Sequence, residues 1–238
     1  MLKAKQLCKR YGDQLALDRL DLEVPPGEVF CLLGPNGAGK TTTVNLFLGF
    51  TQPSSGQALV GGVDAAAQPL QARRLLAYIP ENVMLYGKLS GVENLRYFVA
   101  LATGAEPGVP EAEALLQRAG LPASALHLRV AGYSKGMRQK VGIAVAWAKH
   151  ARALLLDEPT SGLDPLAANE FAATVQSMRS QGLAILMVTH DLFLAQQCGT
   201  RVGIMQRGRL VDVLSNARTD AASLERAYLA ASQLPEAA

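Results

Sequence analysis

The pattern of apolar and polar positions predicts two kinds of strand at the start of the chain. Residues 2–8 and 15–24 alternate apolar with polar side chains, which is typical of half-buried antiparallel strands. Residues 29–33 are continuously apolar, as expected of a strand buried on both faces, and a helical run follows at 41–49. The pattern then predicts three shorter elements, namely a strand near 58–60, a helix over 69–76 and a strand over 76–79.

The character of the chain changes after residue 81. Helical spacing dominates, and no convincing strand is found until residue 150. The predicted helices cover 92–102, 110–119 and 134–149. We therefore expect one domain over residues 1–238, in which a helical subdomain (82–150) is inserted into an α/β core (1–81 and 151–238).

The alternation of strands and helices resumes after residue 150. Strands are predicted at 153–156 and 183–188 and as a pair within 201–213, with helices at 165–181, 191–197 and near 220–232. This alternation predicts a parallel sheet that is covered by helices on both faces.

Composition narrows the class of protein. The chain has 238 residues, of which 49% are hydrophobic, and its formal net charge is only +3. Without a basic run, binding to nucleic acid is not indicated. We expect a cytoplasmic protein, because neither a signal peptide nor a stretch of about 20 apolar residues is visible. Cys8, Cys31 and Cys198 are far apart, which favours reduced thiols in the cytosol.

The most informative segment is Gly34–Thr41, which reads Gly-Pro-Asn-Gly-Ala-Gly-Lys-Thr. It fits the pattern of a phosphate-binding loop, Gly followed by any four residues and then Gly-Lys-Ser/Thr. Glycines let successive backbone N–H groups face phosphate oxygens, Lys40 places a charge on the β- and γ-phosphates, and the Thr41 hydroxyl can ligate Mg²⁺. The predicted strand before the loop and the helix after it direct a helix N-terminus at the anion.

Acidic residues and a histidine follow two other predicted strands. Asp157 and Glu158 end the apolar run Ala153–Leu156, at the strand end where open α/β sheets bind ligands. Asp157 suits a ligand of Mg²⁺, and Glu158 suits the base that polarises an attacking water. His190 ends a strand that should neighbour the strand of Asp157, so a contact with the γ-phosphate is geometrically plausible.

The segment Tyr133–Met137 precedes a long predicted helix. Ser134 is a good N-cap, and Gly136 would allow a phosphate to approach closely. Taken alone, this segment is better explained as a capped helix start.

Together these motifs resemble the ATP-binding subunit of an ABC transporter over nearly the whole chain. Gly34–Thr41 is similar to the Walker A motif, Ala153–Glu158 to Walker B, Tyr133–Met137 to the signature and Ser161–Asp164 to the D-loop. The resemblance implies an ABC-type P-loop NTPase fold with an N-terminal antiparallel β-subdomain and an inserted helical subdomain. It implies ATP and Mg²⁺ as cofactors and catalysis by Glu158 and His190. The residues implied in ATP binding are Tyr11, Gly34, Pro35, Asn36, Gly37, Ala38, Gly39, Lys40, Thr41, Thr42, Ser134, Lys135, Gly136 and Asp164, and those implied in metal binding are Thr41, Glu81 and Asp157.

Two motifs depart from the family's usual pattern. Glu81 stands where the family usually has Gln, and Lys135 and Met137 replace Gly and Gln of the signature Leu-Ser-Gly-Gly-Gln. Both departures resemble a bacterial branch whose ATPases work with separate ABC-2-type membrane subunits. Within that branch, Pro80–Val83 and Tyr86–Glu93 are similar to the ATPase of the nitrous-oxide-reductase maturation system, which serves assembly of a copper site.

The resemblance implies an ATPase that pairs with a second copy of itself or with a paralogous subunit. Each ATP would lie between the phosphate loop of one subunit and Ser134–Gly136 of the other. Such a dimer would sit peripherally on the inner face of the cytoplasmic membrane and drive separate transmembrane subunits. Three alternatives are a soluble ABC ATPase of cofactor assembly or translation, a GTP-dependent switch or small-molecule kinase, and a non-hydrolysing regulatory module. An Asn-Lys-x-Asp guanine-reading motif is missing, and Glu158 and His190 argue against the regulatory module.

Overall fold

The N-terminal strands form a small antiparallel sheet in the computed structural model, which describes residues 1–232. The order in this sheet is β2-β1-β4-β5. Its members are β1 (Leu2–Tyr11), β2 (Gln14–Val24), β4 (Ser55–Val60) and β5 (Val63–Asp64). The alternation predicted for 2–8 and 15–24 is confirmed as an antiparallel pair.

One irregularity in this pair was not anticipated. Leu20 opposes Leu7, but Leu17 opposes Lys9, so three steps along β2 match two along β1. The extra residue forms a β-bulge near Arg19, whose φ is +47°. Because of the bulge, Leu17 and Leu20 are both buried although their spacing would place them on opposite faces of a regular strand.

The second sheet has six strands in the order β10-β9-β3-β8-β7-β6. All neighbours are parallel except the antiparallel pair β9 and β10. The strands are β3 (Val29–Leu33), β6 (Leu76–Ile79), β7 (Ala153–Asp157), β8 (Ala184–Thr189), β9 (Arg201–Gln206) and β10 (Arg209–Ser215). This order brings the carboxyl ends of β3, β8 and β7 to one edge, with β8 in the middle.

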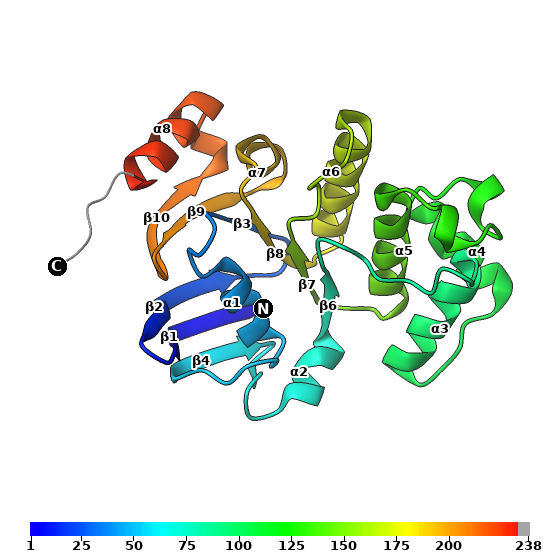
Figure 1. Cartoon of the computed structure of the whole chain (residues 1–238), viewed down its shortest axis with the longest axis horizontal. Coiled ribbons are helices and arrows are strands. Elements are labelled where there is room, and N and C mark those ends of the chain that lie inside the picture. The colour runs from blue at the N-terminus through cyan, green and yellow to red at the C-terminus, as the bar shows by residue number, and fades with distance from the viewer. Residues whose placement is uncertain (233–238) are drawn as a thin grey trace.

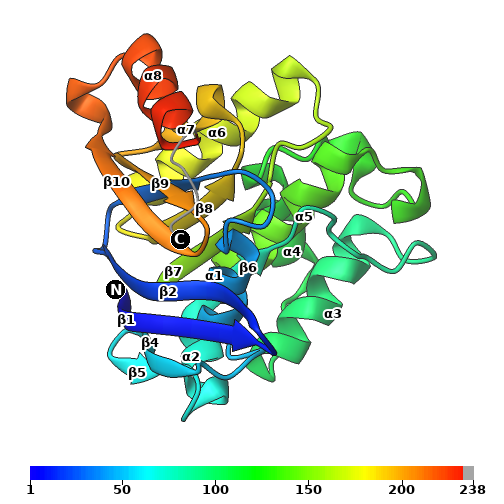
Figure 2. The same ribbon diagram turned by 60° about the vertical axis from the view of Figure 1, so that its left-hand side comes forward.

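Both faces of the parallel sheet are covered, as predicted. Phe30 and Leu32 face a core shared with helix α1 (Lys40–Phe47) and the antiparallel sheet, while Cys31 and Leu33 face the helices on the other side. Helix α1 therefore lies between the two sheets (Figure 2). The remaining core helices are α2 (Pro69–Leu75), α6 (Pro165–Ser180), α7 (Leu192–Cys198) and α8 (Ala221–Ser232).

Three α-helices lie between β6 and β7 in the chain and extend to one side of the core (Figure 1). They are α3 (Gly91–Thr103), α4 (Val109–Arg118) and α5 (Lys135–Ala148), joined by 3₁₀ turns at Ala123–Ala125 and Val130–Gly132. Ser90 and Glu93 form a capping box that fixes the start of α3. Across residues 1–232, no helix combines the length and apolar character needed to cross a bilayer.

Candidate nucleotide site

The predicted phosphate loop connects β3 to α1, and its glycines are required by close packing. A Cβ on Gly34 would lie 2.4 Å from the Met205 carbonyl oxygen, and one on Gly39 would lie 2.5 Å from the Ala16 carbonyl oxygen. Gly39 also has φ of +103° at the N-cap of α1, a conformation that side chains disfavour. The loop can therefore turn tightly and point backbone N–H groups away from the sheet edge.

Lys40 lies inside this loop rather than in solvent. Its side chain is only 7% exposed, and Nζ donates to the carbonyl oxygens of Gly34 at 2.5 Å and Pro35 at 3.1 Å. Burial lowers the Lys40 pKa, and the carboxylates of Glu158 and Asp157 oppose that shift. When a nucleotide binds, the Lys40 ammonium can exchange these carbonyl oxygens for phosphate oxygens with only a small movement.

The two acids at the end of β7 have different surroundings. Burial raises the Asp157 pKa, nearby Glu158 adds to that shift, and the Lys40 ammonium opposes it. The Tyr78 hydroxyl hydrogen-bonds the Asp157 carboxylate, and burial together with that carboxylate raises the Tyr78 pKa to about 12. Asp157 is therefore a desolvated carboxylate held in place, which a cation would stabilise.

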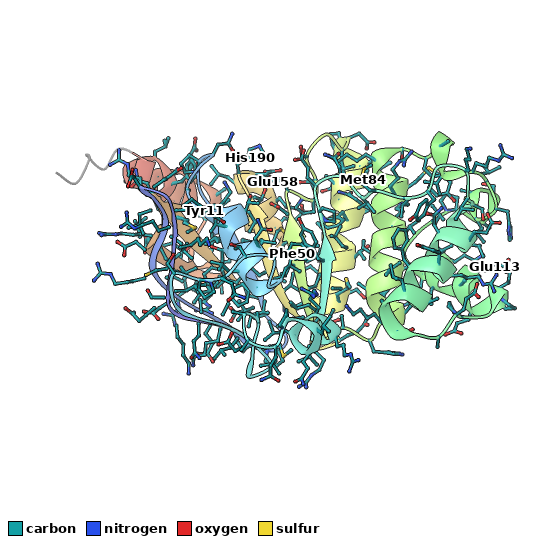
Figure 3. The ribbon with its side chains drawn as sticks, turned by 60° about the horizontal axis from the view of Figure 1, so that its bottom comes forward. Tyr11, Phe50, Met84, Glu113, Glu158 and His190 are labelled. Carbon is teal, nitrogen blue, oxygen red and sulfur yellow. The ribbon has the colours of Figure 1, made fainter. Side chains whose placement is uncertain are left out.

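Glu158 is held by the end of the neighbouring strand β8. Its Oε2 lies 3.2 Å from the Thr189 hydroxyl, 3.3 Å from the His190 backbone nitrogen and 2.9 Å from His190 Nδ1. The Glu158 side chain is 17% exposed and that of His190 is 64% exposed, and the two lie together in Figure 3. The predicted adjacency of the two strands is confirmed, because Asp157 pairs with Val188.

The backbone at Glu158 is unusual for a residue with a side chain. Its φ is +46°, in the left-handed region, and its N–H donates to the Val188 carbonyl oxygen at 2.8 Å. Such a conformation costs about 1–2 kcal/mol for an L-residue. The turn that follows β7 thus directs this carboxylate toward His190 at the expense of local strain.

These elements enclose a cleft of about 560 Å³, a size within the usual range for small-molecule sites. Tyr11 lies at its rim, 46% exposed, with Lys9 Nζ 4.7 Å above its ring. The lining residues are Tyr11, Gln14, Ala16, Asn36, Gly37, Ala38, Gly39, Lys40, Thr41, Thr42, Glu81, Asp157 and Glu158. Gln14 and Ala16 were not predicted, although the hairpin that pairs Tyr11 with Gln14 could have identified Gln14.

The donor set in the cleft fits Mg²⁺ carried by a nucleotide. Glu81, Asp157 and Glu158 bring three carboxylates to a wall that also contains Lys40, and the Thr41 hydroxyl adds a neutral oxygen. Among residues 1–232, no group of three or more His, Cys, Asp and Glu side chains is arranged to hold a metal by itself. Mg²⁺ typically takes one or two carboxylates and completes its shell with water and substrate phosphates.

The remaining predicted site residues do not line this cleft. Ser134 caps α5 by accepting from Met137 N at 3.2 Å, and Asp164 caps α6 by accepting from Ala167 N at 2.9 Å. Lys135 and Gly136 begin α5. Within one chain Ser134 and Asp164 therefore have local structural roles, whereas Lys135 Nζ lies 3.6 Å from Glu81 Oε1, and contact of all four residues with nucleotide stays a prediction.

Comparison with known proteins agrees with this geometry. The family profile described as ABC transporter matches residues 17–161. The chain is 34% identical over 214 residues to the uncharacterized ABC transporter ATP-binding protein YhcH of Bacillus subtilis, which covers 90% of this chain and 69% of YhcH. It is 37% identical over 212 residues to the probable multidrug ABC transporter ATP-binding protein YbhF of Escherichia coli, which covers 89% of this chain. The chain spans only 36% of the length of YbhF.

Solved structures give the same result. The structure of an ATP-binding subunit of an ABC transporter superposes with a TM-score of 0.82 at 32% identity, covering 98% of this chain and 100% of the other. A dimeric ATP-binding cassette with bound ADP and Pi, at 23% identity, shares the fold with a TM-score of 0.79, covering 91% of this chain and 99% of the other. The chain belongs to the ABC transporter family and has the fold of that family's ATP-binding cassettes.

Proposed function

We propose that this single ATP-binding domain hydrolyses Mg²⁺–ATP as one half of a dimer and drives separate transmembrane subunits. The observation that carries the proposal is the contact between Glu158 and His190 beside the phosphate loop, 2.9 Å between Oε2 and Nδ1. That contact orients a carboxylate toward the cleft, where it can polarise a water.

The predicted site residues of the cleft have distinct parts in this proposal. Tyr11 would stack on the adenine, the loop N–H groups and Lys40 would hold the β- and γ-phosphates, and Thr41, Glu81 and Asp157 would hold the metal. Bound Mg²⁺ supplies charge neutralisation for the phosphate oxygens. Glu158 accepts a proton from the attacking water, and His190 keeps that carboxylate in position. The sites are completed by Ser134, Lys135, Gly136 and Asp164 of a second copy.

An exposed aromatic surface supports docking of a membrane subunit. Met84 is 81% exposed and follows Glu81 closely in the chain, and Figure 3 shows it on the same side of the molecule as Glu158. Two residues further along the chain, Tyr86 packs edge to face against Tyr97 of α3 with ring centroids 5.0 Å apart, and both are exposed. Exposed apolar patches of this kind mark interaction sites. We propose that a cytoplasmic segment of an ABC-2-type transmembrane subunit covers this surface.

Two experiments test the proposal. Glu158→Gln protein at micromolar concentration should dimerise when ATP is added, measured by light scattering, because a ligand that contacts both subunits stabilises the dimer. The matched control carries Lys40→Ala as well and should stay monomeric. The second experiment asks whether the chain co-purifies with a membrane protein. If the chain hydrolyses ATP but never co-purifies with one, a soluble ABC ATPase of cofactor assembly or translation is favoured instead.

The sequence likeness to the nitrous-oxide-reductase maturation ATPase supports a narrower proposal, that the exported or imported cargo serves assembly of a copper enzyme. Relatives bear other names, including a Nod factor export ATP-binding protein of Cupriavidus metallidurans, 37% identical over 215 residues that cover 89% of this chain and 70% of that protein. Deletion of the gene in a host that makes nitrous oxide reductase should yield an enzyme low in copper. A normal copper content would contradict this narrower proposal and leave the ATPase assignment intact.

A further inference from the structure

Three segments that are distant in the chain meet at a single oxygen atom of Glu81. Oε1 accepts a hydrogen bond from Ser161 Oγ at 2.9 Å and lies 3.6 Å from Lys135 Nζ. Glu81 follows β6, Ser161 follows β7, and Lys135 is the first residue of α5. Glu81 and Lys135 are also two of the positions at which the sequence departs from the usual family pattern, so both departures take part in one ion pair.

The pair has a clear electrostatic reason. A lysine at the N-terminus of a helix is unfavourable, because this end of the helix carries partial positive charge. Helix α5 has no acidic residue in its first turn, so the Glu81 carboxylate supplies from another segment the negative charge that the helix lacks. The side chains are 25% exposed for Lys135 and 47% for Glu81. Pairs this accessible to water change an equilibrium constant only a few-fold, which is suitable for a contact that must break.

The same carboxylate also lines the nucleotide cleft, together with Thr41 and Asp157. Glu81 is thus placed between two cation positions, the Lys135 ammonium on one side and the proposed Mg²⁺ position on the other. If the Glu81 carboxylate ligated a metal ion tightly, it would attract the Lys135 ammonium less strongly.

We propose that Lys135 competes with nucleotide-bound Mg²⁺ for the Glu81 carboxylate, so that occupation of the cleft releases the N-terminus of α5 from the core. This inference rests on the proposed function, because it needs Mg²⁺ to enter the cleft with the nucleotide. It makes Lys135 a positioning residue in its own chain, in addition to any contact with a second copy. The Glu81–Lys135 pair would then report occupation of the cleft to the segment that faces the partner.

The competition is measurable by binding alone, without turnover. A fluorescent ADP analogue, used at protein concentrations too low for dimerisation, gives one dissociation constant with Mg²⁺ and one with EDTA. Their ratio, EDTA over Mg²⁺, measures how much the metal strengthens binding; a direct effect of the lysine charge on the nucleotide would also change the ratio, but it would do so whether or not Glu81 is present. Lys135→Met should raise this ratio about two- to fivefold, because Mg²⁺ no longer has to displace a lysine. Lys135→Arg should leave it near the wild-type value.

Two controls isolate the pair. Lys140→Met removes another lysine of α5, one that is paired with Glu170 at 2.8 Å, and should leave the ratio unchanged. Glu81→Gln should lower the ratio. Adding Lys135→Met to Glu81→Gln should have no further effect, because the effects of mutations at two interacting residues are not additive.

The result has three readings. An unchanged ratio in Lys135→Met, or an equal rise in the Glu81→Gln background, would overturn the competition while leaving the ATPase assignment in place. Wild-type protein that binds no nucleotide under either condition would overturn the proposed function as well. A rise that depends on Glu81 supports the inference.

Discussion

His190 Nδ1 lies 2.9 Å from Glu158 Oε2, although helix α6 and strand β8 separate the two residues in the chain. The contact exists because β8 pairs with β7, so both strands deliver their next residues to the same edge. The carboxylate is also held by the Thr189 hydroxyl and the His190 N–H.

The first prediction separates binding from hydrolysis. Glu158→Gln should retain ATP affinity and lose about 10²–10⁴-fold in turnover, because it removes a base that acts on water. Lys40→Ala should lower turnover too, and in addition it should weaken ATP binding about 10- to 100-fold, since it removes a charged hydrogen-bond donor to phosphate. Calorimetry and a phosphate-release assay measure the two effects. Near-normal turnover in Glu158→Gln would remove this residue from the catalytic role.

The second prediction concerns how His190 acts. His190→Ala should keep ATP affinity and lose roughly 10²-fold in turnover, because the Glu158 carboxylate loses the ring contact that orients it. Asn can place an amide nitrogen near the position of Nδ1, so His190→Asn should retain more turnover than His190→Ala. If the two variants are equally inactive, the Nδ1 contact is not the source of the effect, and the role of the ring lies at Nε2.

The third prediction is that Glu158 stores backbone strain. Its φ of +46° is tolerated by Gly but not by Ala, so Glu158→Gly should be more stable than Glu158→Ala by about 1 kcal/mol. Urea unfolding measures the difference. The matched control is Glu170, an exposed residue inside α6, where Gly should be less stable than Ala by about 1 kcal/mol. The same order at both positions would contradict the strain.

The fourth prediction places Ser134 in the partner's site. Ser134→Arg should block dimer closure by its bulk, and Lys40→Ala should disable the phosphate loop. A mixture of the two variants contains a heterodimer with one intact composite site, so part of the ATP-dependent pairing should return. Cross-linking or light scattering detects it, with each variant alone as control. A mixture that pairs no better than either variant, while both remain folded, would exclude this role for Ser134.

The sequence alone determined the phosphate-binding loop and the buried strands, because the residues that indicate each of these features lie within a few positions of one another. The glycine pattern of Gly34–Thr41 predicts a loop whose backbone can face phosphate, and the apolar runs at β3, β7 and β8 have the length and pattern of strands buried on both faces. The sequence also predicted that β8 would neighbour β7, which made a role for His190 plausible.

The tertiary structure decided what depends on pairing between distant segments. Only the pairing of β1 with β2 showed that Ala16 lies in the cleft and that a bulge occurs near Arg19. The meeting of Glu81, Lys135 and Ser161 likewise depends on how the helices after β6 pack against the core. Such contacts are set by side-chain packing and sheet order rather than by local backbone preference, so no spacing in the sequence encodes them directly.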